Sequence, residues 1–210
     1  MLADLAAVRL YLAEEWMWLD QAILEGANGA HLPLARCVAS GLRKLPYYRG
    51  PAMVQAGTVG LVADWFRQNR FVVDWGFWTA STAAAARSGG GPGFLVWSLT
   101  GRHLGTVDQD DPDRLVFSPG TRFKVLQVTE GRRPVVLMRE LFPREPTEQR
   151  PAGAGIDHTK WLDESTAAEL EGVMTARPVA GDADTTAPRG RLPGLVVTTT
   201  SQGSRVRRPT

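Results

Sequence analysis

The chain has 210 residues, with 24 Lys and Arg against 22 Asp and Glu, so its formal net charge is only +2. This length allows one domain with its own core plus a tail, and so small a charge does not indicate a nucleic-acid partner. The single cysteine, Cys37, excludes a disulfide within the chain. No run approaches the roughly 20 apolar residues of a membrane span, and the first residues lack a secretory signal. We therefore expect a cytoplasmic protein with no membrane partner.

Apolar residues at helical spacing dominate the first part of the chain. They predict one helix over about residues 4–25 and a second over about 32–43. The second helix ends before Leu45-Pro46, because the residue before a proline avoids helical angles. The apolar pattern begins at once at Leu2, which is typical of a piece of a larger polypeptide.

The middle of the chain has the residue types of short strands separated by turns. Glycine-rich connections and the scarcity of long helical patterns favour strands followed by short loops, with one short helix at 61–68. Helices that precede a strand-rich half indicate the α+β class. The expected strands are residues 51–56, 70–75, 77–81, 94–98, 115–117, 122–129 and 135–141.

The composition changes after Phe142, where Pro, Glu, Thr, Gly and Ala replace the large apolar residues. We expect a domain over 1–142 and a linker with an amphipathic helix over 143–177. That helix spans about 160–176, with Trp161 on its apolar side. Residues 178–210 form an Arg-, Pro-, Gly- and Thr-rich segment, which predicts disorder.

Common catalytic and metal-binding patterns are missing from the sequence. His31, His103 and His158 lie far apart, and no zinc spacing joins them to a cysteine, so we expect no metal. The acidic loop at 108–113 lacks the central glycine and closing glutamate of a calcium loop. The glycine-rich stretch at 88–93 lacks the Lys-Ser/Thr of a phosphate-binding loop.

Three short motifs occur in a specific order between residues 45 and 125. They are Leu-Pro-Tyr-Tyr-Arg-Gly at 45–50, Gly-Phe-Trp-Thr-Ala-Ser at 76–81 and Pro-Gly-Thr-Arg-Phe-Lys-Val at 119–125. In this order they resemble the motifs of the bacterial mono-ADP-ribosyltransferases of the arginine–serine–glutamate type. The resemblance covers about half of the chain. It implies an ADP-ribosyltransferase-like split β-sandwich of two packed, mostly antiparallel sheets with N-terminal helices.

The resemblance also implies where the three functional positions of that family fall. The arginine that grips the NAD phosphates falls on Val54, and the serine motif falls on Thr79 to Ser81. The glutamate that stabilises the developing positive charge falls on Arg114, which reverses the charge there. We therefore predict a catalytically degenerate pseudoenzyme that needs no cofactor and serves as a scaffold or binds a protein partner.

Two alternatives remain open. In the first, the chain is an active NAD-dependent mono-ADP-ribosyltransferase or NAD glycohydrolase with a rearranged site, in which Arg49 and Ser81 bind NAD and Asp113 replaces the glutamate. The alternation of side chains along a strand counts against it, because Arg49 lies five residues before Val54 and Asp113 one residue before Arg114. In the second, the helix near 161–174 and the tail are the working parts of an interaction module.

Overall fold

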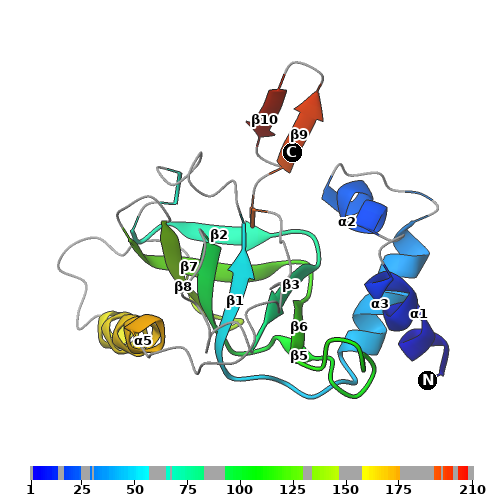
Figure 1. Cartoon of the computed structure of the whole chain (residues 1–210), viewed down its shortest axis with the longest axis horizontal. Coiled ribbons are helices and arrows are strands. Elements are labelled where there is room, and N and C mark those ends of the chain that lie inside the picture. Colours follow the sequence, from blue (N-terminus) through cyan, green and yellow to red (C-terminus); the bar gives the residue numbers. More distant parts are fainter. Residues whose placement is uncertain are drawn as a thin grey trace.

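The computed structural model describes residues 2–13, 17–24, 29, 31–56, 65–66, 68–82, 93–129, 134–146, 158–175, 192–194, 196–200 and 203–207. Helices α1 (Leu2–Leu12), α2 (Met17–Leu24) and α3 (Leu32–Leu42) form a group on one side of a large sheet (Figure 1). Helix α5 (His158–Thr175) lies on the opposite side (Figure 1). The expected helix at 32–43 is confirmed, with Pro33 in its first turn, where a missing backbone N–H costs nothing.

The single helix expected over 4–25 is wrong, because the chain bends between α1 and α2. The Tyr11 hydroxyl donates to Asp20 Oδ2 at 2.8 Å. In one continuous helix these residues would lie about 13 Å apart along the axis, at about 1.5 Å per residue. The bend also lets Leu19 pack with Val8 in the cluster that covers the sheet. Tertiary packing therefore overrides a continuous helical pattern.

Eight strands form one sheet in the order β2-β7-β8-β4-β1-β3-β6-β5. Every neighbouring pair is antiparallel except β4 and β8. The strands β1 and β3 are paired only at Met53 and Ser81, so the sheet divides there into parts of five and three strands. The bounds are β1 Gly50–Gln55, β2 Phe71–Asp74, β3 Trp78–Ser81, β4 Gly93–Ser98, β5 Arg102–His103, β6 Arg114–Phe117, β7 Thr121–Val128 and β8 Val135–Glu140.

The two parts of the sheet pack face to face around Trp78, which is 1% exposed. Its ring centroid lies 5.6 Å from those of Phe117 and Phe94 and 5.2 Å from that of Phe123. Phe117 belongs to the three-stranded part, and Phe94 and Phe123 belong to the five-stranded part. The expected α+β class and split sandwich are therefore confirmed, with the difference that one pairing joins the two parts.

The helices α1–α3 cover the outer face of the three-stranded part. Val8, Val38 and Leu42 pack there against Phe77 and Val116. A polar contact adds to this packing, because the Phe77 N–H donates to Asp20 Oδ1 at 3.0 Å. The helices therefore bury Phe77 and Val116 on the outer face of the three-stranded part.

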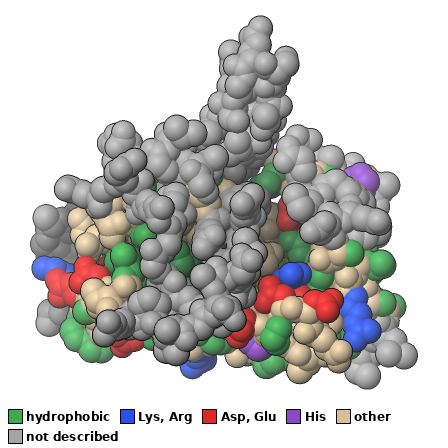
Figure 2. All heavy atoms as spheres, viewed as in Figure 1, with side chains coloured by type: hydrophobic (Ala, Val, Ile, Leu, Met, Phe, Trp, Pro, Cys, Tyr) green, Lys and Arg blue, Asp and Glu red, His purple; other side chains and the backbone are tan. Residues whose placement is uncertain are grey.

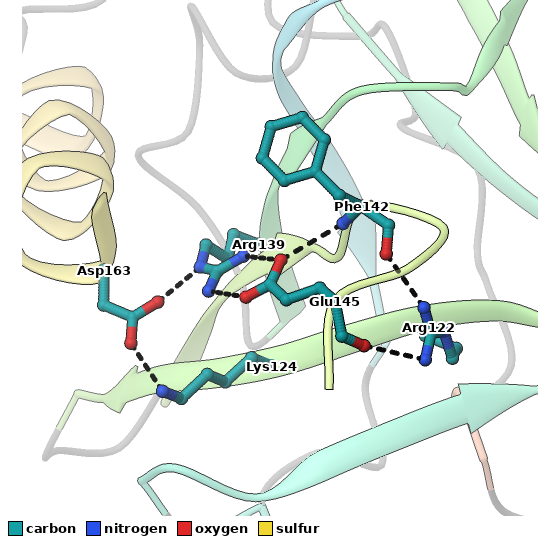
Figure 3. A network of polar contacts seen from close by, with 6 residues as sticks. All are labelled: Arg122, Lys124, Arg139, Phe142, Glu145 and Asp163. Carbon is teal, nitrogen blue, oxygen red and sulfur yellow. Dashed lines mark hydrogen bonds and ion pairs between the residues drawn. The ribbon is translucent and has the colours of Figure 1, made fainter. Parts of the chain in front are cut away.

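Helix α5 packs on the outer face of the five-stranded part through Leu170, which contacts the cluster of Met53, Leu95 and Leu137. Charged side chains add to this contact, because Asp163 of α5 pairs with Lys124 and Arg139 of the sheet (Figure 3). The expected helix is confirmed. The expectation for Trp161 is wrong, since its side chain is 71% exposed.

The C-terminal region differs from the disorder expected over 178–210. Strands β9 (Val196–Thr200) and β10 (Gly203–Arg207) pair as an antiparallel hairpin. Leu192 lies in the core. Short runs of Val and Thr favour paired strands even where the surrounding composition is polar. The average composition of residues 178–210 does not reveal these short runs. Most of the expected helix at 61–68, the connection at 88–92 and residues 178–191 lie outside the described residues.

Candidate functional site

The point where the two parts of the sheet meet brings two of the expected site residues together. Ser81 of β3 lies opposite Met53 of β1 on one side and opposite Arg114 of β6 on the other. Directly opposed residues of antiparallel strands place their side chains on the same face. Thr79 shares that face by alternation along β3. The structure therefore places Thr79, Ser81 and Arg114 on one face.

The guanidinium of Arg114 is held by the loop that precedes its strand. Its Nη1 lies 3.1 Å from Asp108 Oδ2, and its Nε donates to Asp111 Oδ2 at 3.1 Å. The first contact is an ion pair without hydrogen-bond geometry. Asp108 is 9% exposed, and its Oδ1 accepts the Asp111 N–H at 3.2 Å. Figure 2 shows basic and acidic side chains side by side over this end of the sheet.

Val54 lies elsewhere. It is fully buried in the apolar core between the two parts of the sheet, opposite Phe94 in the register of β1 and β4. A guanidinium at this position would be surrounded by apolar side chains, where an unpaired charge is very costly. Whether Val54 replaces the family's arginine stays a prediction, but its place in the core offers no route to a ligand.

Arg49 is exposed and comes directly before β1. In a regular extended strand, side chains alternate, and Arg49 would lie on the face opposite to Val54. Gly50 stands between them with a φ of +145°, and a residue in that conformation interrupts the regular alternation of a strand. Counting therefore does not decide the side on which Arg49 lies, and its exposure leaves the guanidinium accessible.

Asp113 occupies the next rung beyond Ser81 and Arg114. The Thr82 N–H donates to the Asp113 carbonyl oxygen at 3.0 Å, and the Thr82 hydroxyl donates to Asp113 Oδ1 at 3.1 Å. Both residues lie just outside β3 and β6, so the alternation of side chains along a strand does not decide the face on which the Asp113 carboxylate lies. Asp113 contacts Thr82, while the residue paired with Ser81 is Arg114.

Tyr48 and His103 lie near Asp113. Burial raises the pKa of Tyr48, and the negative charge of Asp113 raises it further. The Tyr48 ring lies 6.2 Å from the ring of His103, and its hydroxyl donates to the Pro51 carbonyl oxygen at 3.0 Å. Sequence reasoning missed Tyr48, Thr82 and the aspartates around Arg114. The spacing of Asp108 and Asp111 before Arg114 is the one signal that could have indicated the ion pairs.

No group of three or more His, Cys, Asp or Glu side chains among the described residues could hold a metal ion. No helix in the described part of the chain has the length and apolar character needed to cross a membrane.

Known proteins resemble this chain in sequence and in fold. No protein-family model matches the chain. A Mycobacterium avium (strain 104) protein that bears the name of an NAD(+)–arginine ADP-ribosyltransferase, Mav, is 27% identical over 132 residues, which cover 60% of this chain and 16% of that protein. The chain therefore spans only a small part of this relative's length.

Solved structures carry the comparison further. The type III effector XopAI from Xanthomonas axonopodis pv. citri matches with a TM-score of 0.54 and 24% identity, over 66% of this chain and 63% of that one. The Vis toxin, an ADP-ribosyltransferase from Vibrio splendidus, matches with a TM-score of 0.52 and 18% identity, over 67% and 73%. Exoenzyme S from Pseudomonas aeruginosa, solved with human 14-3-3 protein beta and carba-NAD, matches with 0.53 and 15%, over 77% and 82%. The chain has the fold of the bacterial ADP-ribosyltransferases, and the resemblance inferred from the three motifs is confirmed.

Proposed function

We propose that the chain is an ADP-ribosyltransferase-fold protein without transferase activity, which serves as a scaffold for a protein partner. The observation that carries this proposal is the strand pair of Ser81 and Arg114, since the motif order assigns the family's glutamate to Arg114, which carries a guanidinium. Cleavage of NAD develops positive charge on the ribose, and a cation beside it opposes that charge instead of stabilising it. A cytoplasmic location remains a prediction from the sequence.

The contacts of Arg114 also make it a poor ligand for the NAD phosphates. Its charge is already compensated by Asp108 and Asp111, at 3.1 Å each. The described residues on the Ser81 face of β3 and β6 include no carboxylate opposite Ser81. The residues at this position therefore do not fit the nicotinamide ribose of NAD, and we derive no reaction step through it.

A second candidate is an active transferase or glycohydrolase that uses Arg49, Ser81 and Asp113. One observation favours it. The Asp113 carboxylate accepts a hydrogen bond from the Thr82 hydroxyl, and its charge helps to raise the pKa of Tyr48, the neighbour of Arg49. The relatives add support, since the name of the Mycobacterium avium protein includes NAD(+) and Exoenzyme S was solved with carba-NAD. Arg114, rather than Asp113, is the residue paired with Ser81, which counts against this candidate.

The two candidates differ in what happens to NAD. The test measures nicotinamide release by chromatography and NAD binding by calorimetry, on the full chain and on Arg49→Ala and Asp113→Asn. Arg43→Ala is the matched control, because Arg43 is also exposed but lies at the end of α3. We expect no release by any of the four proteins. Release by the wild type and the control that both site variants abolish would replace the scaffold proposal with the enzyme.

A protein partner is the second part of the proposal. Exoenzyme S provides a precedent for this fold, since it was solved in complex with human 14-3-3 protein beta. An enzyme fold that has lost its catalytic activity still presents a folded surface. Evolution keeps such a surface where it binds another molecule. We propose no nucleic acid as that molecule, because the net charge of the chain is only +2.

A further inference from the structure

The hairpin of β9 and β10 forms a sheet of its own near the C-terminus. Its register has no bulge from Gly203, which lies opposite Thr200, to Arg207. Figure 1 shows the hairpin standing away from the large sheet. Among the described strands, β9 and β10 pair only with each other, so each has one edge with no described strand beside it. A hairpin of two strands is marginally stable in water, and a third strand stabilises such a sheet.

The region around this hairpin is strongly basic. From residue 185 to residue 210 the sequence has five arginines and no Asp, Glu or Lys. The net charge of the whole chain is only +2, so the rest of the chain carries a net negative charge. Positive charge that is concentrated on one short segment attracts acidic partners and increases the rate of their encounter.

Two of these arginines have a fixed place in the hairpin. Arg205 and Arg207 belong to β10, where their positions lie opposite Thr198 and Val196 of β9. Residues two apart in a strand lie on the same face, so both arginine positions share one face of the hairpin. Strand β9 contains only valine and threonine. A third strand beside β10, and not beside β9, would therefore have an arginine directly across from it at every second residue.

We propose that the free edge of β10 binds an acidic peptide segment of a partner protein, which adds a third strand with a carboxylate at every second residue. In this mode of binding, backbone hydrogen bonds supply affinity and alternate side chains supply specificity. Opposite charges directly across paired strands are stabilising, so Asp or Glu suits the positions opposite Arg205 and Arg207. This inference rests on the proposed scaffold function only for the existence of a protein partner.

A protein segment fits this edge better than a nucleic acid does. The edge of a sheet presents a row of backbone N–H and C=O groups, and a peptide strand pairs with both kinds of group. Proteins that bind single-stranded nucleic acid combine basic residues with aromatic side chains on which bases stack. Residues 185–210 contain no aromatic residue. The hairpin therefore has the charge for a nucleic acid but no platform for its bases.

The test measures the binding of two fluorescein-labelled peptides to the full chain by fluorescence anisotropy. The first peptide alternates glutamate with valine over seven residues, and the second has the same composition with its glutamates consecutive. Both peptides carry the same charge, but only the first can place a carboxylate opposite each arginine of β10. We expect the alternating peptide to bind about tenfold more tightly, because two cross-strand ion pairs depend on the spacing. Its binding should also slow the amide hydrogen exchange of β10.

Charge reversal separates the edge of β10 from the general charge of the region. The variant Arg205→Glu/Arg207→Glu should lose the preference for alternating glutamate and should prefer a peptide that alternates lysine with valine. The matched control is Arg189→Glu/Arg191→Glu, which changes the net charge equally but outside β10. This control should keep the preference of the wild type for the alternating acidic peptide.

Several results would overturn the binding edge. They include absence of binding by the alternating peptide, equal affinity of the wild type for the two acidic peptides, and an equal loss of affinity in both double variants. Binding that leaves the amide exchange of β10 unchanged would exclude a third strand. A single-stranded DNA oligonucleotide that binds more tightly than the alternating peptide would assign the hairpin to nucleic acid instead. Nicotinamide release by the same samples would reject the scaffold function alone, because the two peptides decide the binding edge independently.

Discussion

Replacement of Arg139 by alanine should lower the free energy of unfolding by about 3–5 kcal/mol, because it removes a buried cation that two partly buried carboxylates share. The Arg139 side chain is 2% exposed, and those of Glu145 and Asp163 are 8% and 14% exposed. Nη1 and Nη2 donate to Glu145 Oε2 and Oε1 at 2.9 and 2.5 Å, while Nε donates to Asp163 (Figure 3). Burial alone would raise the pKa of Glu145, but the hydrogen bond and charge of Arg139 hold it below its usual range.

Urea unfolding followed by circular dichroism measures this loss. The control is Lys160→Ala on the same helix, where the ion pair with Glu164 has an N–O distance of 3.8 Å and both side chains are at least 67% exposed. Such a pair contributes at most about 0.5 kcal/mol. The double variant Arg139→Ala/Asp163→Ala should lose less than the sum of the single losses, because each single loss includes the ion pair that the two residues share. Equal losses for Arg139→Ala and Lys160→Ala would refute the reasoning.

Three further predictions concern the core and the buried polar groups. Trp78→Ala should cost about 3–5 kcal/mol in urea unfolding, since the ring fills the space between the two parts of the sheet; a loss below about 1 kcal/mol would contradict that packing. Asp20→Ala should cost about 1–3 kcal/mol, because it leaves the Phe77 N–H and the Tyr11 hydroxyl without this acceptor, whereas the exposed Asp110→Ala should cost almost nothing. Burial raises the pKa of Glu140 above its ordinary value of 4.5, although hydrogen bonds from Leu99 and Thr100 oppose the shift. The contribution of the protonated Glu140 side chain to stability is therefore present below pH 4.5 and is lost as the pH rises through the raised pKa. The free energy of unfolding of the wild type relative to Glu140→Gln should fall as the pH rises through this interval. A difference between the two proteins that does not change with pH would count against a raised pKa.

The sequence predicted part of the candidate site. The motif order placed Ser81 on one strand and Arg114 directly before another, and the structure pairs the two residues between β3 and β6. The partners of Arg114 and the neighbours of Asp113 could not be predicted in the same way. They depend on how the loop at 108–113 folds back, and on the meeting of Tyr48 with a strand that begins more than sixty residues later.

Local patterns in the sequence determined the elements that depend on neighbouring residues. The apolar spacing of α3, the turn chemistry and β-branched residues of β7 and β8, and the amphipathic pattern of α5 all predicted the observed elements, because helical periodicity and strand alternation act over a few residues. The α+β class followed from their order.

Only the tertiary structure decided the features that depend on distant contacts. The separation of α1 from α2 allows the hydrogen bond between Tyr11 and Asp20. Leu192 packs into a core that is built mainly from residues 52–138. The position of Val54 in the apolar interior also depends on which strands flank β1. In each case the free energy comes from burial against residues far away in sequence, and no local pattern carries that information.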